Sequence, residues 1–306
     1  MSPSKPVRVA FIASASHSGS TILGMVLGSD PRAVFAGEVK QYRGLHELSR
    51  QRNERGRCGC GAWYEDCHFW NGVWHRCPPA MDLHASPGFS WRNLGLVLRL
   101  FLPGAGSPDR RADGDHTEGD AYAEAIAAIR DEAAERDPRI DLVVDSSKSL
   151  RSVDMLAQSA NVELFVIHLI RDGALVAASY KRRGKGALNG MAAWLYSALL
   201  TNRFATRNDV RSLVLDYDRL CVSTGEELDR LNAFFGTSLS PDRVAERVRG
   251  TEYHVLAGNR VSRGAARFDG LVSNSSASEL NLAQRMAAWM LLRPIYRALT
   301  GRPESR

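Results

Sequence analysis

Residues 7–21 read Val-Arg-Val-Ala-Phe-Ile-Ala-Ser-Ala-Ser-His-Ser-Gly-Ser-Thr, and most of the fold prediction rests on this stretch. Its first half is apolar enough to predict a short strand, and the small residues from Ser14 to Ser20 predict a loop. A helical pattern begins at Thr21. In a strand–loop–helix unit, the backbone N–H groups of the loop and the positive end of the helix converge on an anion. The stretch therefore predicts a phosphate-binding loop.

The loop differs from the Walker A pattern G-x-x-x-x-G-K-[ST] at an informative position. Gly19 and Thr21 are in register with that pattern, but Ser20 stands where the lysine belongs. An NTPase uses this lysine at the β- and γ-phosphates. We therefore expect a loop that holds a phosphate without ordinary ATPase chemistry. A generic strand–turn–helix with a serine-rich turn is the alternative interpretation.

A second strand–helix unit lies at residues 162–183. Leu164 to Ile170 has the composition of a buried strand, and a helical pattern follows Arg171-Asp172. Arg171 stands at the carboxyl end of the strand, and Ser179 lies two helical turns further on. A guanidinium and a hydroxyl in these places are suited to a second phosphate.

The ordered pair of units resembles the sulfotransferases that use 3′-phosphoadenylyl sulfate (PAPS), in particular bacterial members like the carbohydrate and tyrosylprotein sulfotransferases. The resemblance implies that the first loop binds the 5′-phosphosulfate, and it assigns Arg171 and Ser179 to the 3′-phosphate. The loop residues concerned are Ser16, His17, Ser18, Gly19, Ser20 and Thr21. The family usually has lysine or arginine where this chain has His17, which puts a fixed positive charge there in doubt.

Other stretches extend the resemblance over about residues 7 to 265. Gly37-Glu38 matches the position of a catalytic base, and Leu142 to Lys148 is a strand that ends in Asp-Ser-Ser-Lys. Residues 214–236 resemble a late strand–helix unit of the family. Residues 254–260 resemble its C-terminal cofactor loop. Arg260 and Arg263, on the late Gly/Asn-containing loop, are candidate contacts to the 3′-phosphate, with a solvated basic loop as the alternative.

Sulfuryl transfer to a hydroxyl requires a base, donors for the leaving bisphosphate and a cradle that aligns the donor. Glu38 is the candidate base, because its strand, residues 33–36, should enter the sheet beside the first strand. His17 is the second candidate, since histidine titrates in a suitable range. Lys148 is the candidate that polarises the leaving group. The alternatives are a helix-terminal charge for Glu38 and a surface lysine for Lys148.

The alternation of elements predicts an α/β protein with a three-layer, P-loop NTPase-like fold around a parallel sheet. We expect one domain, residues 1–306, with a Cys/Trp-rich acceptor-side insertion at about 53–120. Strands are expected at 7–13, 33–36, 140–145, 163–169 and 211–215. Helices are expected at 20–29, 40–52, 118–136, 151–159, 172–183, 188–206, 223–235, 241–248 and 279–299. Residues 53–80 are expected to be irregular, and 103–117 and 250–278 to be loops.

Composition favours an ordinary globular protein. A hydrophobic share of 44% and a charged share of 24% are typical of globular domains. The net charge of +6 suits a polyanionic ligand such as PAPS, whereas the dispersed basic residues do not indicate nucleic-acid binding. The short runs Lys181-Arg-Arg183 and Arg110-Arg111 are interpreted as solvated surface. We expect a cytoplasmic location, since residues 7–21 make a poor signal peptide.

Four of the five cysteines, Cys58, Cys60, Cys67 and Cys77, lie within twenty residues. A similar Cys-rich insert that ends in Cys-x-Phe-Trp, as Cys67 to Trp70 do here, occurs in bacterial sulfotransferases. That likeness implies a structural loop near the acceptor site. Plain or redox-reactive thiols, a disulfide and a zinc site all stay open, because Cys-x-Cys is not a standard knuckle spacing. No metal is expected at the reaction centre.

The acceptor is the least determined part of the prediction. Residues 53–120 hold Trp63, Trp70, Trp74 and Trp91, which suit a sugar face or a lipid or polyketide tail. The Gly-Glu and Asp-Ser-Ser-Lys motifs favour the hydroxyl of a carbohydrate, glycolipid or glycosylated small molecule. Residues 90–102 predict an amphipathic helix that packs on the core or, alternatively, lines the acceptor pocket or touches a membrane surface.

Two other functions compete with this interpretation. A P-loop small-molecule kinase would use the strand Leu142 to Asp145 as a Walker B strand, with Asp145 on Mg²⁺. A non-catalytic bisphosphate-binding protein would keep the fold and lose the reaction. Glu38 and Lys148 favour an enzyme, and the missing Walker lysine disfavours the kinase.

Overall fold

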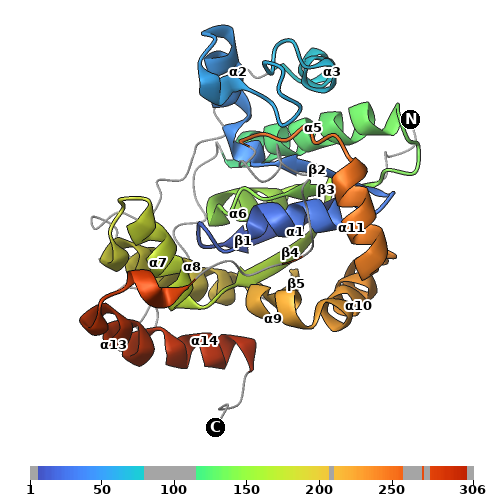
Figure 1. The fold of residues 1–306 in the computed structure, drawn as a ribbon. Coiled ribbons are helices and arrows are strands. Elements are labelled where there is room, and N and C mark those ends of the chain that lie inside the picture. The colour runs from blue at the N-terminus through green and yellow to red at the C-terminus, as the bar shows by residue number, and fades with distance from the viewer. Residues whose placement is uncertain (1–5, 79–114, 207–209, 258–270, 272–275, 302–306) are drawn as a thin grey trace.

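The computed structural model describes residues 6–78, 115–206, 210–257, 271 and 276–301. Its centre is a five-stranded, all-parallel sheet in the order β2-β3-β1-β4-β5 (Figure 1). The strands are β1 (Val7–Ser14), β2 (Ala33–Gly37), β3 (Leu142–Asp145), β4 (Val162–Ile170) and β5 (Arg211–Asp216). The predicted parallel α/β architecture is thus confirmed.

Helices cover both faces of the sheet, and the alternating side chains of β1 divide the core between them (Figure 1). Val9 and Phe11 pack with α5 (Asp115–Ala134), α6 (Leu150–Gln158) and α8 (Ala187–Ala205). Ala10 and Ile12 pack with α1 (Ser20–Leu27), α10 (Thr224–Phe235) and α11 (Pro241–Gly250). Because β1 is apolar on both faces, it takes the middle of the sheet.

The remaining elements lie around these layers. A smaller core joins α7 (Gly173–Arg182) and α8 to α13 (Leu282–Leu291) and α14 (Arg293–Thr300). The other elements are η1 (Val39–Gln41), α2 (Tyr42–Arg50), η2 (Glu54–Gly56), α3 (His68–Arg76), α9 (Tyr217–Val222) and η5 (Ala277–Glu279). Among the residues that the structure covers, no helix is both long and apolar enough to span a membrane.

One predicted neighbour in the sheet is wrong. The strand that precedes Glu38 was expected beside the first strand, but β3 lies between β2 and β1. All four residues of β3 are buried, so this strand takes an inner position and leaves β2 nearer the edge. The carboxyl ends of all five strands still meet at one edge, where ligands bind in open parallel sheets.

Three helix predictions also need correction. Residues 53–80 are not irregular throughout, since α3 buries Phe69, Trp70, Val73 and Trp74 on one face. The helix expected at 223–235 is preceded by α9, and the helix expected at 279–299 is broken into α13 and α14 near Pro294, which lacks a backbone donor. The predicted helix at 90–102 and most of the predicted loop at 103–117 lie outside the described residues.

Candidate active site

The predicted anion loop has the conformation that such a loop requires. Gly19 precedes α1 with a φ of 91°, and a Cβ there would lie 2.2 Å from the ring of Tyr217. Only glycine meets both conditions. The hydroxyls of Ser14 and Ser18 and the Nε2 atom of His17 are buried without a hydrogen-bond partner in the described part of the chain. Buried polar atoms are normally satisfied, so these atoms fit a site built to receive a polar ligand.

Arg171 brings the second predicted phosphate site to the first. Its buried side chain leaves the end of β4 and donates from Nη1 to the carbonyl of His17 at 3.2 Å. Its Nε lies 3.7 Å from a carboxylate oxygen of Asp218, and its guanidinium lies 5.0 Å from the centre of the Tyr217 ring. Ser179 is buried on α7, the helix that follows β4. The two strand–loop–helix units therefore share one edge of the sheet.

Glu38 is positioned by an irregularity at the end of β2. The pairing of β2 with β3 shifts register between Phe35 and Gly37, and Gly37 has a φ of 82°. The chain at Leu256 pairs alongside: its N–H donates to Ala36, and its carbonyl accepts from the N–H of Glu38 at 2.9 Å. A Cβ on Gly37 would lie 2.2 Å from that carbonyl oxygen. The Gly-Glu pair is therefore a backbone requirement as well as a chemical one.

Glu38 and Lys148 form an ion pair across the ends of β2 and β3. The Nζ of Lys148 donates to Oε1 at 2.5 Å, and Gln41 donates to Oε2 at 2.8 Å. Burial opposes ionisation of Glu38, but the charge and hydrogen bond of Lys148, together with Lys40 and Gln41, hold the pKa of this carboxyl below its usual value. The carboxylate is therefore ionised at neutral pH.

Asp145 lies buried at the end of β3, next to this pair, and its carboxylate is occupied by hydrogen bonds from the protein. The carboxylate is fully buried and accepts hydrogen bonds from the hydroxyl of Tyr122, the hydroxyl and N–H of Ser147, and the N–H of Val39. Ser147 in turn accepts from the N–H of Lys40 at 3.0 Å. This network ties the end of β3 to the residues after Glu38. It occupies the carboxylate that the kinase interpretation assigned to Mg²⁺.

His17 does not provide the positive charge that the family usually has at its position. Burial, followed by the charges of Arg183, Lys185, Lys148 and Arg171, lowers the pKa of His17 to about 4. The imidazole is therefore neutral at pH 7. Its ring lies edge-on to Tyr180 at 5.1 Å.

Arg183 and Lys185 are the functional candidates that sequence reasoning missed. Arg183 was interpreted as solvated surface, and both side chains are exposed. Their charges nevertheless lower the pKa of His17, and the Nζ of Lys185 lies 5.8 Å from the centre of the Tyr180 ring, which packs edge-on against His17. Gly184 and Gly186, which both have a positive φ, turn the chain after α7. A run of basic residues in the sequence does not reveal that turn.

Two other groups of predicted residues need comment. Arg260, Arg263 and Trp91 lie outside the described residues. Trp70 and Trp74 belong to the hydrophobic core, whereas Trp63 is half-buried, with the guanidinium of Arg57 4.0 Å from the centre of its ring. The prediction of an aromatic acceptor platform is therefore wrong for Trp70 and Trp74, and for Trp63 it stays a prediction. The buried rings of Trp70 and Trp74 pack the insertion against α2 and α5.

The predicted cysteine cluster is present with a different fourth member. Cys58, Cys60 and Cys67 lie together with His254, whereas Cys77 ends α3 and is not part of the group. All five cysteines are free thiols in the structure.

Comparison with known proteins finds the same fold in solved sulfotransferase domains. The sulfotransferase domain of the olefin synthase from Synechococcus PCC 7002 is 16% identical, with a TM-score of 0.51, and the match covers 95% of this chain and 97% of that one. The sulfotransferase domain from the curacin biosynthetic pathway gives the same identity and TM-score over 94% of this chain and 99% of that one. No protein-family model and no curated protein sequence matches this chain. The likeness therefore lies in the fold.

Proposed function

We propose that this chain is a sulfotransferase that moves a sulfuryl group from PAPS to a hydroxyl. The observation that carries the proposal is the meeting of an anion loop, a buried arginine and a Glu–Lys ion pair at one edge of a sulfotransferase-like sheet. PAPS supplies a sulfuryl group activated on its 5′-phosphate, and its 3′-phosphate serves as a handle.

Each end of the donor has residues suited to it. The loop from Ser16 to Thr21 and the start of α1 face the 5′ end with N–H groups, hydroxyls and the helix dipole. Arg171 and Ser179 are assigned to the 3′-phosphate, with Arg260 and Arg263 as further candidates. Arg183 and Lys185 add the charge that His17 lacks.

Glu38 is the proposed base. Its ionised carboxylate can take the proton of the acceptor hydroxyl as the new S–O bond forms and the S–O bond to the 5′-phosphate breaks. Lys148 stands beside it, where a cation offsets negative charge on the leaving oxygen. His17 is the weaker candidate, because four cations around its ring oppose a gain of charge on the imidazole.

The same geometry argues against the competing kinase. A γ-phosphoryl group carries more charge than a sulfuryl group, and kinases neutralise it with Mg²⁺ and a lysine. Ser20 stands at the lysine position, and Asp145 is engaged by Tyr122 and Ser147. We therefore propose transfer without a metal at the reaction centre.

The acceptor proposal is a hydroxyl on a carbohydrate, glycolipid or glycosylated small molecule, as the Gly-Glu and Asp-Ser-Ser-Lys motifs suggest. One structural neighbour is part of an olefin synthase and another serves the curacin pathway. An acceptor screen with radiolabelled sulfate should therefore include hydroxylated biosynthetic intermediates beside sugars. Labelling of amines only would contradict the hydroxyl assignment.

Calorimetry with adenosine 3′,5′-bisphosphate tests the donor site without an acceptor. We expect binding without Mg²⁺, and a loss of about 2–4 kcal/mol in Arg171→Ala because a buried charged contact disappears. Arg211→Ala is the matched control, since Arg211 is exposed at the start of β5, at the opposite edge of the sheet. Equal affinity for adenosine 5′-phosphate would remove the 3′-phosphate assignment. Binding without turnover of any acceptor would favour the non-catalytic alternative.

A further inference from the structure

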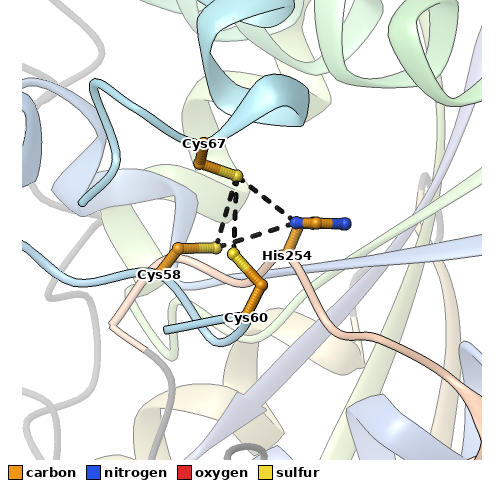
Figure 2. Close-up of side chains that lie close together, drawn as sticks. All are labelled: Cys58, Cys60, Cys67 and His254. Atoms are coloured by element: carbon orange, nitrogen blue, oxygen red, sulfur yellow. Dashed lines mark hydrogen bonds between the residues drawn. The ribbon is translucent and has the colours of Figure 1, made fainter. Parts of the chain in front are cut away.

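A cluster of possible metal ligands lies at the insertion. The donor atoms of Cys58, Cys60, Cys67 and His254 lie within 4.8 Å of one another (Figure 2). The Sγ of Cys67 lies 3.7 Å from that of Cys58, 3.8 Å from that of Cys60 and 3.3 Å from Nδ1 of His254. Cys58 lies 3.9 Å from the same nitrogen. All four donors point toward one centre (Figure 2).

These separations match the edges of a metal-centred tetrahedron. Zn–S bonds of about 2.3 Å and Zn–N bonds of about 2.0 Å at tetrahedral angles give S···S edges of roughly 3.8 Å and S···N edges of roughly 3.5 Å. A disulfide instead requires sulfurs about 2.05 Å apart. Cys58 and Cys67 are buried, and Cys60 and His254 are half-buried. Three unbonded sulfur atoms and an imidazole nitrogen packed this closely fit the coordination of one shared metal ion.

The turn that carries Cys58 and Cys60 is shaped for this purpose. The N–H of Cys58 donates to Ala62 and that of Gly61 donates to Cys58, and Gly61 has a φ of 93°. A Cβ on Gly59 would lie 2.3 Å from the carbonyl oxygen of Tyr253, so this glycine lets the turn approach the histidine-bearing segment. Backbone N–H groups of Cys60, Ala62 and Trp70 reach the sulfurs of Cys58, Cys60 and Cys67, respectively. Such N–H groups stabilise metal-bound thiolates.

The ring of His254 is held by a second layer of contacts. Its Nδ1 faces the sulfurs, and its Nε2 lies 3.7 Å from a carboxylate oxygen of Glu252. The ring of Phe69 stacks on it at 5.4 Å with an interplanar angle of 16°. A nearby carboxylate and a packed ring are the kind of surroundings that orient a metal-binding histidine.

We propose that Cys58, Cys60, Cys67 and His254 bind one Zn²⁺ ion. Three thiolates and an imidazole in a tetrahedron select zinc among the common divalent ions. Four protein ligands close the coordination shell, so the ion is structural and takes no part in the transfer chemistry.

The site fastens two distant parts of the chain beside Glu38. The zinc ligands Cys58 and His254 are 196 residues apart, and the same two segments meet again where Tyr64 donates to the carbonyl of Val255 at 2.9 Å. The next residue, Leu256, accepts the N–H of Glu38. Zinc therefore holds the segment, residues 254–256, that orients the proposed base.

Metal analysis of the purified protein tests the site independently of any activity. We expect about one zinc per chain when the protein is made with added zinc and kept reduced. Cys67→Ser and His254→Ala should lower the zinc content at least about tenfold. His254→Cys, which offers a fourth thiolate, should retain it. Cys77→Ser is the matched control and should keep the full content, since Cys77 lies outside the cluster.

A second measurement covers variants that fail to fold. Co²⁺ added to chelator-stripped wild-type protein should give the intense visible bands of tetrahedral thiolate coordination, and zinc should abolish them. Stripping should lower Tm by at least about 5 °C. Wild-type protein that carries no zinc and gives no such Co²⁺ bands, or that contains a disulfide between two of these cysteines, would overturn the proposal. So would zinc retained in Cys67→Ser. If sulfotransferase activity is established, Co²⁺- and Cd²⁺-loaded protein should keep it, as a structural site requires.

Discussion

Glu38 and Lys148 form a 2.5 Å contact although 110 residues separate them in the chain. Each stands on or next to backbone with a positive φ. Gly37, which precedes Glu38, has a φ of 82°, and Lys148 itself has a φ of 63°. Backbone of this kind is unfavourable away from glycine, and it persists where surrounding contacts hold it. At this site the contacts are those of Asp145, Ser147 and Leu256.

Glu38→Gln should separate chemistry from binding. The amide keeps the size of the side chain but cannot accept the proton, so turnover with saturating acceptor should fall by roughly 10²–10⁴-fold. The affinity for adenosine 3′,5′-bisphosphate should stay nearly unchanged. His17→Ala should be the milder change in turnover.

Glu47→Gln is the control for the first prediction, because Glu47 is exposed on α2, where it accepts a hydrogen bond from Gln51. Turnover of Glu38→Gln within twofold of wild type would remove Glu38 from the mechanism. A severe loss in His17→Ala with a mild one in Glu38→Gln would transfer the role of base to His17.

Arg183 and Lys185 should contribute to donor binding through charge. The double variant Arg183→Gln with Lys185→Gln should weaken bisphosphate binding by about 3- to 10-fold, because each exposed cation contributes a modest, screened attraction. Raising the salt concentration should shrink the difference from wild type. Arg182→Gln is the control, since Arg182 belongs to the same basic run and is exposed at the end of α7. Equal losses in the control would mean that overall charge, not position, is responsible.

At the scale of elements, the end of β2 depends on a close approach between two backbones. Gly37 and Leu256 form an isolated parallel bridge, and the segment at residues 253–257 thereby extends the sheet past β2. The same segment carries His254. The end of one short strand thus connects the sheet, the proposed base and the proposed zinc site.

Gly37→Ala should disrupt this contact. The added methyl group meets the carbonyl oxygen of Leu256 and sits on a backbone with positive φ, so we expect a loss of about 1–3 kcal/mol of stability and a lower turnover. Gly44→Ala is the matched control: Gly44 lies in α2 with nothing within 4 Å of a new Cβ, and alanine favours a helix. Thermal unfolding of both variants checks the prediction. A Gly37→Ala protein as stable as the control would show that the close approach is unimportant.

At the scale of the whole molecule, a histidine buried in the sheet contributes to how stability depends on pH. His168 lies inside β4 with 1% of its surface exposed, and burial lowers its pKa to about 3. The unfolded chain has an ordinary histidine pKa near 6.5. Below that pH the unfolded state binds a proton that the folded state excludes. The contribution of neutral His168 to the free energy of unfolding is therefore complete above about pH 6.5, and it is lost as the pH is lowered toward 3.

His168→Leu should flatten this response. Between pH 7 and pH 5 the wild-type protein should lose about 2 kcal/mol more stability than the variant, because only the unfolded state titrates in that window. Denaturant unfolding of both proteins at each pH measures the difference, in which the other titrating groups cancel. If the free energies of unfolding of the two proteins change equally between pH 7 and pH 5, folding does not disfavour protonation of His168 and the prediction is wrong.

The sequence alone determined what depends on neighbours along the chain: the glycine-containing loop before α1, Arg171 at the end of β4, the Gly-Glu pair and the parallel alternation of strands and helices. These features arise from short-range spacing, which a linear pattern records. The sequence could not place β3 between β1 and β2, bury Trp70 and Trp74, or bring Arg183 to His17. It also named Cys77 where the fold supplies His254, 196 residues from Cys58. Tertiary structure decided these points because each depends on which distant surfaces bury one another, and burial is settled only when the sheet and its two helical layers come together.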